Sequence, residues 1–318
     1  ILLMATNQQY DVEEVGVLYM KRERTGELSA GNVGYLTAAI RKVQDTKVGD
    51  TVTLANNRCD EPISGFKEVK PMVFSGIYPA DSDGFEELRE ALGKLAINDS
   101  AITYEPESST ALGFGFRCGF LGLLHMEIVQ ERLEREFNQV IVTTVPNVRY
   151  NLLLTNGEEI WVENPAQMPA PTKIEETREP FIKAQIITPA EYVGAVIKLC
   201  MDRRGTLLGQ TYLTPTRLDL SFELPLAEVV FDFYDKLKSQ TRGYASFDYH
   251  PIEYRESDIV KMDILLNAEK VDALSALIHR GRAQDFGRKL CEKLKELLPR
   301  QQFLIAIQAA IGAKIVAR

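Results

Sequence analysis

One order of predicted elements occurs twice in this 318-residue chain, and this repetition limits its possible folds more than any other feature. Residues 71–146 predict strand, helix, strand, strand, helix, strand, from Met72–Tyr78 to Val140–Val145. Residues 180–256 predict the same order and end in the strand Ser246–Tyr254. Each predicted helix carries an apolar stripe that must bury against another element. The βαββαβ order therefore predicts two ferredoxin-like domains, each with two helices on one face of a four-stranded antiparallel sheet.

The helix limits in the second repeat are predicted from local signals. Thr188-Pro189-Ala190-Glu191 matches a capping box with proline at the first helical position, which predicts a helix start. Gly205 is predicted to end that helix. Prolines and glycines between the repeats predict that residues 147–179 form an irregular connector.

The two ends of the chain predict different structures. Short strands with Gly-Asp turns in residues 1–66 predict part of a β-barrel. Near the C-terminus we expect a strand at Val260–Leu266, a long helix at about 271–298 and a β segment from Phe303. The expected fold class is α+β: a partial β-barrel, two ferredoxin-like βαββαβ domains and a C-terminal α/β domain. The expected domains are 1–66, 67–146, the connector 147–179, 180–257 and 258–318.

Motif content argues against an enzyme made of this chain alone. The sequence has no Gly-x-x-x-x-Gly-Lys-Ser/Thr loop, nucleophile elbow or His-Glu-x-x-His motif. Its four cysteines are scattered without a CxxC pair, so neither a disulfide framework nor a zinc site is expected. No apolar run reaches the roughly 18 residues of a membrane span. No catalytic or metal-binding residue is predicted, and His125 is expected to have a structural role.

A glycine-rich segment, Gly113-Phe114-Gly115-Phe116-Arg117-Cys118-Gly119-Phe120, is predicted to be a strand that runs directly into an amphipathic helix. Its glycines should permit close backbone packing. Phe114 and Phe116 should share one face of the strand. They either pack inside the domain or stack on bases, as the third strand of an RNA-recognition motif does.

Charge is distributed unevenly along the chain. The total is −8, but residues 259–318 hold eleven Lys and Arg against six Asp and Glu, so this part carries +5 and the rest −13. Such asymmetry is typical of a nucleic-acid-binding face or of a solvated helix face. The candidate RNA-binding residues are Arg203, Arg204, Arg280, Arg282, Arg288 and Lys289. Arg203 and Arg204 have an alternative interpretation, because arginines at a helix C-terminus complement the helix dipole.

Several motifs together resemble the elongation factor 4 (LepA) family of translational GTPases. They lie in the predicted barrel, the glycine-rich segment, the second repeat and the C-terminal region. These motifs are Ala30-Gly31-Asn32-Val33-Gly34, Leu224-Pro225-Leu226-Ala227-Glu228-Val229-Val230-Phe231-Asp232-Phe233, Arg242-Gly243-Tyr244-Ala245-Ser246-Phe247-Asp248-Tyr249, Lys293-Leu294-Lys295-Glu296-Leu297-Leu298-Pro299-Arg300-Gln301-Gln302-Phe303 and Gln308-Ala309-Ala310-Ile311-Gly312. Elongation factor G has a whole domain between its ferredoxin-like domains, whereas residues 147–179 are too few for one, since small domains start near about 50 residues.

The resemblance implies the ribosome- and tRNA-docking part of a GTPase that promotes back-translocation or rescues stalled elongating ribosomes. It implies rRNA, ribosomal proteins and tRNA as partners, no DNA, a cytoplasmic location and peripheral association with the inner membrane. GTP and Mg²⁺ would bind a G domain that is expected to be missing, as are part of the barrel and a basic C-terminal tail. Two other classes stay open: a free-standing RNA-recognition-type protein and a regulatory domain array with a small-ligand pocket between its ferredoxin-like units.

Overall fold

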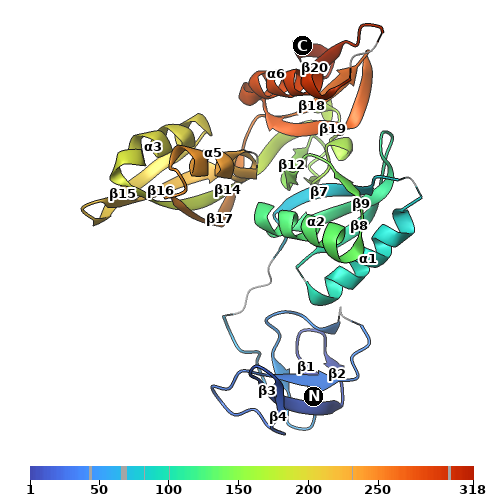
Figure 1. Ribbon diagram of the computed structural model, residues 1–318, viewed down its shortest axis with the longest axis vertical. Helices are drawn as coiled ribbons and strands as arrows, with labels where there is room; N and C mark the ends of the chain where they lie inside the picture. The colour runs from blue at the N-terminus through green and yellow to red at the C-terminus, as the bar shows by residue number, and fades with distance from the viewer. Residues whose placement is uncertain (43–44, 66–69, 82, 100, 231, 300–301) are drawn as a thin grey trace. The chain divides into compact units, whose positions relative to one another are not determined.

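The computed structural model describes residues 1–42, 45–65, 70–81, 83–99, 101–230, 232–299 and 302–318 (Figure 1). The predicted boundary between residues 66 and 67 and the motif residues Phe231, Arg300 and Gln301 lie outside this described part. Contacts between Cα atoms divide the chain into two units: residues 1–70 with 93–101, and residues 71–92 with 102–318. The α+β class is confirmed, because helices and several antiparallel sheets alternate along the chain.

The first unit contains two small antiparallel sheets. One has the order β2-β1-β6, and the other has the order β4-β3-β5. Leu2 and Leu3 of the first sheet are buried. In the described residues the two sheets are three-stranded, separate and not closed into a barrel, so the partial β-barrel stays a prediction. The strands are β1 (Leu2–Leu3), β2 (Gln8–Gln9), β3 (Val12–Leu18), β4 (Arg22–Arg24), β5 (Gly34–Ala38) and β6 (Val52–Thr53).

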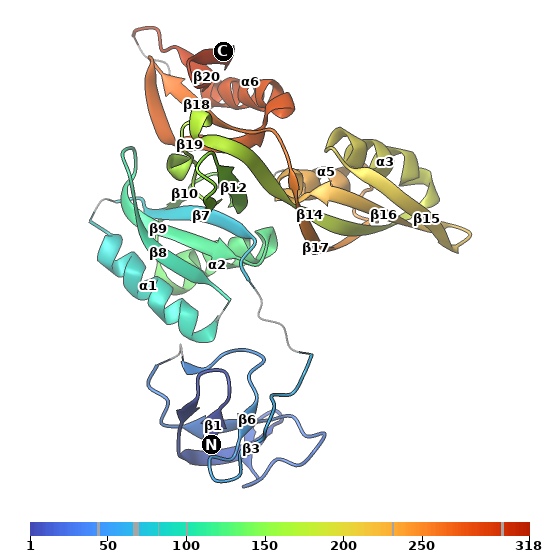
Figure 2. The same ribbon diagram turned by 180° about the vertical axis from the view of Figure 1, so that it is seen from behind.

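The first ferredoxin-like domain has the predicted βαββαβ order, and its strands pair as β10-β7-β9-β8. Both helices lie on one face of the sheet (Figures 1 and 2). Leu88, Leu92, Val129 and Leu133 are buried, whereas Leu124 at the start of the second helix is 70% exposed. The elements are β7 (Val73–Pro79), α1 (Phe85–Asn98), β8 (Thr103–Ser109), β9 (Gly113–Phe120), α2 (Leu123–Phe137) and β10 (Ile141–Thr143); β11 (Asn147–Val148) also pairs with β7.

The glycines of β9 permit the close packing that was expected. A Cβ atom on Gly115 would lie 2.4 Å from the Tyr78 ring, and one on Gly119 would lie 2.5 Å from the Thr103 hydroxyl. His125 has a structural contact, because its Nδ1 accepts a hydrogen bond from the Leu121 amide at 3.0 Å, just before α2 begins.

Phe114 and Phe116 lie on the helix-covered face of the sheet. Both rings contact Phe85 of α1, with centroids 6.1 and 4.8 Å away, so the shared face is confirmed. Phe116 is only 1% exposed, whereas Phe114 is 70% exposed. A base cannot stack on a ring that is buried against a helix. The structure therefore contradicts the RNA-recognition-type interpretation of Phe116.

The second ferredoxin-like domain also has the predicted order, and its strands pair as β17-β14-β16-β15. Its central strand alternates regularly, with Ile182, Ala184 and Ile186 buried and Lys183 and Gln185 exposed. The elements are β14 (Ile174–Pro189), η4 (Ala190–Tyr192), α3 (Val193–Asp202), β15 (Thr206–Thr214), β16 (Arg217–Pro225), α4 (Leu226–Val230), α5 (Phe233–Gln240) and β17 (Ser246–Glu256).

The predicted irregular connector is wrong for much of its length. The strands β12 (Tyr150–Leu154) and β13 (Glu159–Val162) form a hairpin, and β12 pairs with the first part of β14. Only the segment that follows is irregular, and it holds the short turns η2 (Pro165–Gln167) and η3 (Pro171–Lys173). The prolines and glycines correctly indicated these turns, but they led us to miss the strands around them.

The predicted capping box is also wrong. The strand β14 continues through Pro189, and α3 begins only at Val193, after η4. The Thr188 hydroxyl, which the box requires as a helix cap, is buried and has no hydrogen-bond partner in the described part of the chain. Pairing of Thr188 with Leu218 in the sheet replaces the local cap.

The C-terminal domain packs one helix on a four-stranded sheet of order β19-β18-β20-β21. The predicted helix start at residue 271 is wrong, because Glu269–His279 is a strand and the helix begins at Arg280. The two-residue turn Asn267-Ala268 has φ of 51° and 69°, so both residues adopt the positive φ of a type I′ hairpin turn. The elements are β18 (Ile259–Leu266), β19 (Glu269–His279), α6 (Arg280–Leu297), β20 (Ile307–Ile311) and β21 (Lys314–Ala317).

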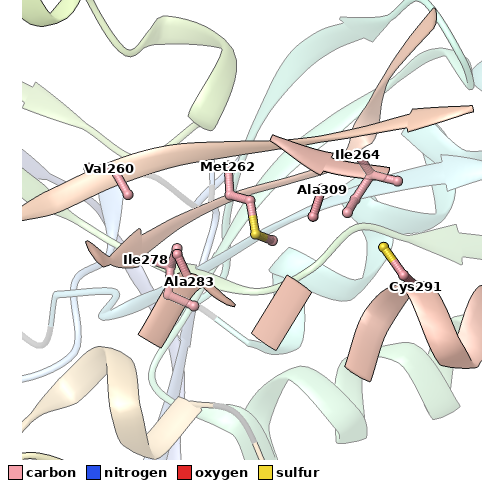
Figure 3. Close-up of a cluster of buried hydrophobic side chains, with 7 residues drawn as sticks. All are labelled: Val260, Met262, Ile264, Ile278, Ala283, Cys291 and Ala309. Atoms are coloured by element: carbon pink, nitrogen blue, oxygen red, sulfur yellow. The ribbon is translucent and has the colours of Figure 1, made fainter. Parts of the chain in front are cut away.

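The core of this domain lies between α6 and the sheet (Figure 3). Gly287 allows the helix to approach closely, since a Cβ atom there would lie 2.8 Å from Cβ of Ala309. One face of α6 is therefore fixed against the sheet, and its other faces are left for charged residues. The core residues are Val260, Met262, Ile264, Ile278, Ala283, Cys291 and Ala309.

Candidate nucleic-acid interface

Arg203 and Arg204 lie where α3 ends. The amides of Arg203 and Gly205 both donate to the Cys200 carbonyl, at 3.0 and 2.9 Å. Arg204, and not the predicted Gly205, adopts the left-handed conformation, with φ of 58°. Gly205 is needed for a different reason: a Cβ atom there would lie 2.6 Å from the Cys200 carbonyl oxygen. This turn directs the chain from α3 into β15.

Arg204 forms a two-pronged ion pair with Glu179 of β14. Its Nη1 and Nη2 atoms lie 2.6 and 2.9 Å from the two carboxylate oxygens, and Glu179 is fully buried. The Arg204 Nε atom donates to Glu228 at 3.0 Å. Burial lowers the pKa of Arg204, but the hydrogen bonds and charges of Glu179 and Glu228 together outweigh burial, so the pKa is raised overall. This guanidinium is committed to carboxylates of its own domain.

Arg203 is buried, with only 4% of its surface exposed. Its guanidinium donates to the Asp232 carboxylate and to the Glu228 carbonyl oxygen. Burial raises the pKa of Asp232, but the hydrogen bonds from Lys236 and Arg203 more than offset this effect and the pKa is lowered. The prediction that Arg203 lies on exposed surface is therefore wrong.

Arg282 of α6 reaches the same carboxylate. Its Nε lies 3.6 Å from Glu228 Oε2, and its Nη1 donates to the Asp202 carbonyl at 3.0 Å. Arg203, Arg204 and Arg282 thus surround Glu228, whose side chain is 8% exposed. We call these four residues, with Glu179 and Asp232, the Glu228 cluster. Three guanidiniums face three carboxylates in it, so the cluster has no excess charge for RNA.

The remaining candidates lie exposed on α6. Arg280 is 58% exposed and pairs with Asp258 at 2.6 Å, which offsets its unfavourable position at the positive end of the helix dipole. Arg288 and Lys289 are exposed and have no ion pair within the residues that the structure describes. The structure therefore separates the six predicted residues: three belong to the Glu228 cluster, and three present their charge to solvent.

Sequence reasoning missed the acidic members of the Glu228 cluster. Glu228 lies within the apolar run Leu226–Val230, and a lone carboxylate among apolar residues is a signal for a buried ion pair. Glu179, between Arg178 and Pro180 in a strand, has no comparable signal.

Other kinds of site find little support. Within the described ranges, no three His, Cys, Asp or Glu side chains gather as metal ligands. Among those same residues, no helix is both long and apolar enough to cross a membrane.

Two family models match the chain. The model of the elongation factor G C-terminus matches residues 176–265, and that of the C-terminus of the GTP-binding protein LepA matches residues 266–318. Elongation factor 4 from Cytophaga hutchinsonii is 59% identical over 312 residues, which cover 98% of this chain and 52% of the relative. Elongation factor 4 from Chlorobium chlorochromatii is 56% identical over 318 residues, which cover 100% of this chain and 53% of the relative.

This chain belongs to the elongation factor 4 family. Elongation factor 4 from Bacillus cytotoxicus is likewise 56% identical over 318 residues, which cover 100% of this chain and 52% of the relative. The chain thus spans about half the length of these elongation factor 4 sequences.

Proposed function

We propose that this chain is the ribosome-docking portion of an elongation factor 4 that acts in translation. Its sheet domains would contact ribosomal RNA and proteins, and its C-terminal domain would contact tRNA. The observation that carries this proposal is the 59% identity to an elongation factor 4 across 98% of the chain. Back-translocation or rescue of stalled elongating ribosomes, in the cytoplasm, is the activity we propose for the whole protein.

GTP hydrolysis is proposed only for the part of such a factor that lies outside this chain. The residues present do not fit GTP and Mg²⁺: the sequence has no phosphate-binding loop, and the described residues hold no metal-ligand cluster. We therefore assign no step of GTP hydrolysis to this chain. Membrane association has no supporting observation here and is not part of the proposal.

The exposed cations of α6 are the RNA contacts that we propose. A phosphate contact needs a positive charge that solvent can reach and that no carboxylate neutralises. Arg288 and Lys289 meet both conditions in the described structure, and Arg280 meets the first. We leave Arg203, Arg204 and Arg282 out of this set because carboxylates and carbonyl oxygens already bind their guanidiniums.

Co-sedimentation with ribosomes that carry tRNA, over a series of salt concentrations, tests this proposal, because α6 belongs to the domain that we propose contacts tRNA. Each phosphate contact releases counterions. The slope of log affinity against log salt concentration should therefore be about −0.7 to −0.9 for each contact. Arg288→Ala should weaken binding and reduce the slope by about that amount. Lys198→Ala, an exposed lysine of α3, is the matched control and should change neither quantity. An unchanged slope for Arg288→Ala would reject α6 as the RNA-binding face.

A regulatory array of ferredoxin-like units finds no support. That alternative requires a small-ligand pocket between the two units. Two of the best-formed pockets in the described part of the chain are lined by residues beyond 173, so the first ferredoxin-like domain contributes to neither of these two.

A further inference from the structure

A cavity of about 300 Å³ lies between the second ferredoxin-like domain and α6. Its walls come from α4, α5, β19 and α6, and the guanidiniums of Arg203 and Arg204 form part of its lining. The volume falls at the lower end of the range for small-molecule sites, about 300–1,000 Å³. A cavity of this size suits a small molecule or a single monomer of a polymer better than a folded protein.

One face of α6 gives the cavity both an apolar and a basic wall. Phe286, Lys289, Leu290 and Lys293 all line it. Their spacing of three, four and seven residues places them on one side of the helix. Phe286 and Leu290 are half-buried, whereas Lys289 and Lys293 are exposed. An apolar surface therefore lies directly beside two ammonium groups.

The cavity carries an excess of positive charge. Six cationic side chains line it, against the three carboxylates of Glu228, Asp232 and Asp285. Two carboxylates outside the lining pair with lining cations: Glu179 with Arg204 at 2.6 Å, and Glu296 with Lys293 at 3.7 Å. One positive charge remains in excess. The phosphate of a nucleotide is negative at neutral pH, with about −1.5 to −2 for a monoester, so its charge is opposite in sign to this excess.

We propose that this cavity binds one nucleotide unit, with its phosphate toward Lys289 and Lys293 and its base against Phe286 and Leu290. Aromatic and apolar side chains next to basic groups are how proteins hold single unstacked nucleotides. The unit comes either from a single-stranded RNA segment or from a free nucleotide. The site shares Lys289 with the RNA contacts proposed on α6, whereas Phe286, Leu290 and Lys293 are not among those contacts.

Isothermal titration tests the proposal with three probes: guanosine monophosphate, a uridylate pentamer and inorganic phosphate. Guanosine monophosphate should bind at least about tenfold more tightly than phosphate, because only the nucleotide buries a base. Equal affinities would overturn the site, since they would mean simple anion attraction. Binding of the pentamer alone would assign the site to RNA, and binding of the mononucleotide alone would assign it to a free ligand. Failure of all three probes to bind would refute it.

Two charge-reversal variants on the same helix separate this site from general electrostatics. Lys289→Glu with Lys293→Glu should weaken nucleotide binding by about tenfold or more, because charge-assisted hydrogen bonds to the phosphate are lost. Arg288→Glu with Lys295→Glu makes the same change in net charge outside the cavity lining. This control should alter nucleotide binding less than about threefold while it weakens ribosome sedimentation. An equal loss of nucleotide binding in both pairs would overturn the proposal.

A third variant blocks the cavity and leaves every charge in place. Ala227 lines the cavity from α4 and is half-buried. Ala227→Met should fill part of the space and reduce nucleotide affinity several-fold. Undiminished nucleotide affinity in this variant would place the ligand elsewhere. Undiminished ribosome binding together with lost nucleotide binding would show that the two sites are distinct.

Discussion

The arginines at the end of α3 and the cations in the middle of α6 have the same chemistry but opposite environments. Arg203 is 4% exposed and bound by Asp232, and Arg204 holds the fully buried Glu179. Arg288 and Lys289 are exposed and have no ion pair in the described part of the chain. The difference teaches that the basic residues in a candidate RNA-binding set must be classified by whether a carboxylate pairs with them. Paired side chains stabilise the fold, whereas unpaired ones remain available to phosphates.

The Glu228 cluster also joins the second ferredoxin-like domain to the C-terminal domain, which the sequence predicted as separate domains. Arg282 of the C-terminal domain contacts Glu228 and the Asp202 carbonyl of the ferredoxin-like domain. Asp272 of β19 links the C-terminal domain to the first ferredoxin-like domain, because its carboxylate accepts hydrogen bonds from the Ser109 hydroxyl and the Thr110 amide at 2.9 and 2.7 Å. Some charged groups of this unit therefore hold neighbouring domains together, whereas others remain available to bind partners.

The largest predicted effect comes from breaking the Arg204–Glu179 pair. Arg204→Met should lower the free energy of unfolding by about 3–5 kcal/mol, because it leaves a buried carboxylate without its partner. Adding Glu179→Leu should recover much of this loss, since both charges are then removed together. Urea unfolding measures both effects. Arg288→Met, the matched change on α6, should leave the unfolding midpoint unchanged. Equal midpoints for Arg204→Met and Arg288→Met would contradict the comparison.

A smaller effect should appear as a dependence of stability on pH. The pKa of Asp232 in the folded chain lies below its ordinary value of 3.8. Burial raises this pKa, but the hydrogen bonds from Lys236 and Arg203 lower it by more than burial raises it. A carboxyl with a depressed folded pKa contributes stability that is fully present above pH 3.8 and is lost as pH falls through the folded pKa. Asp232→Asn should therefore be less stable than the wild type at neutral pH, with a difference that narrows in acid. A constant difference between pH 7 and about pH 2.5 would exclude this ion pair as its source.

Local patterns in the sequence were sufficient to predict both ferredoxin-like domains. Alternation along β14 and helical spacing such as Leu88 and Leu92 are short-range signals that burial then satisfies. The hairpin before β19 escaped prediction because its turn is Asn267-Ala268. Alanine rarely adopts the positive φ that glycine usually provides in such turns. The residues after the turn were therefore predicted as the first part of the helix that actually begins at Arg280.

The environment of the arginines could not be predicted from local patterns. Arg204 meets Glu179 and Glu228, which lie 25 and 24 residues away along the chain. Only the pairing of β14 with β16 and the position of α4 bring these carboxylates to the end of α3. The exposed position of Arg288 was easier to predict, because it lies about 100° around the helix from Gly287, outside the face on which the small residues Ala283 and Gly287 contact the sheet.

The smallest predicted effect distinguishes two exposed arginines of the same helix. Arg280 pairs with Asp258 at 2.6 Å, whereas Arg288 has no carboxylate partner in the described structure. An exposed ion pair contributes only about 0–1 kcal/mol, so Arg280 must give up at most that amount before it binds a phosphate. Arg288→Ala should therefore weaken ribosome binding more than Arg280→Ala, but by no more than about fivefold. Asp258→Asn supplies the control: it should strengthen binding through Arg280 slightly and have no effect when Arg280 is already alanine. If Asp258→Asn strengthened ribosome binding equally with and without Arg280, the gain would come from net charge, and the distinction between paired and unpaired cations would not explain the affinity of α6 for RNA.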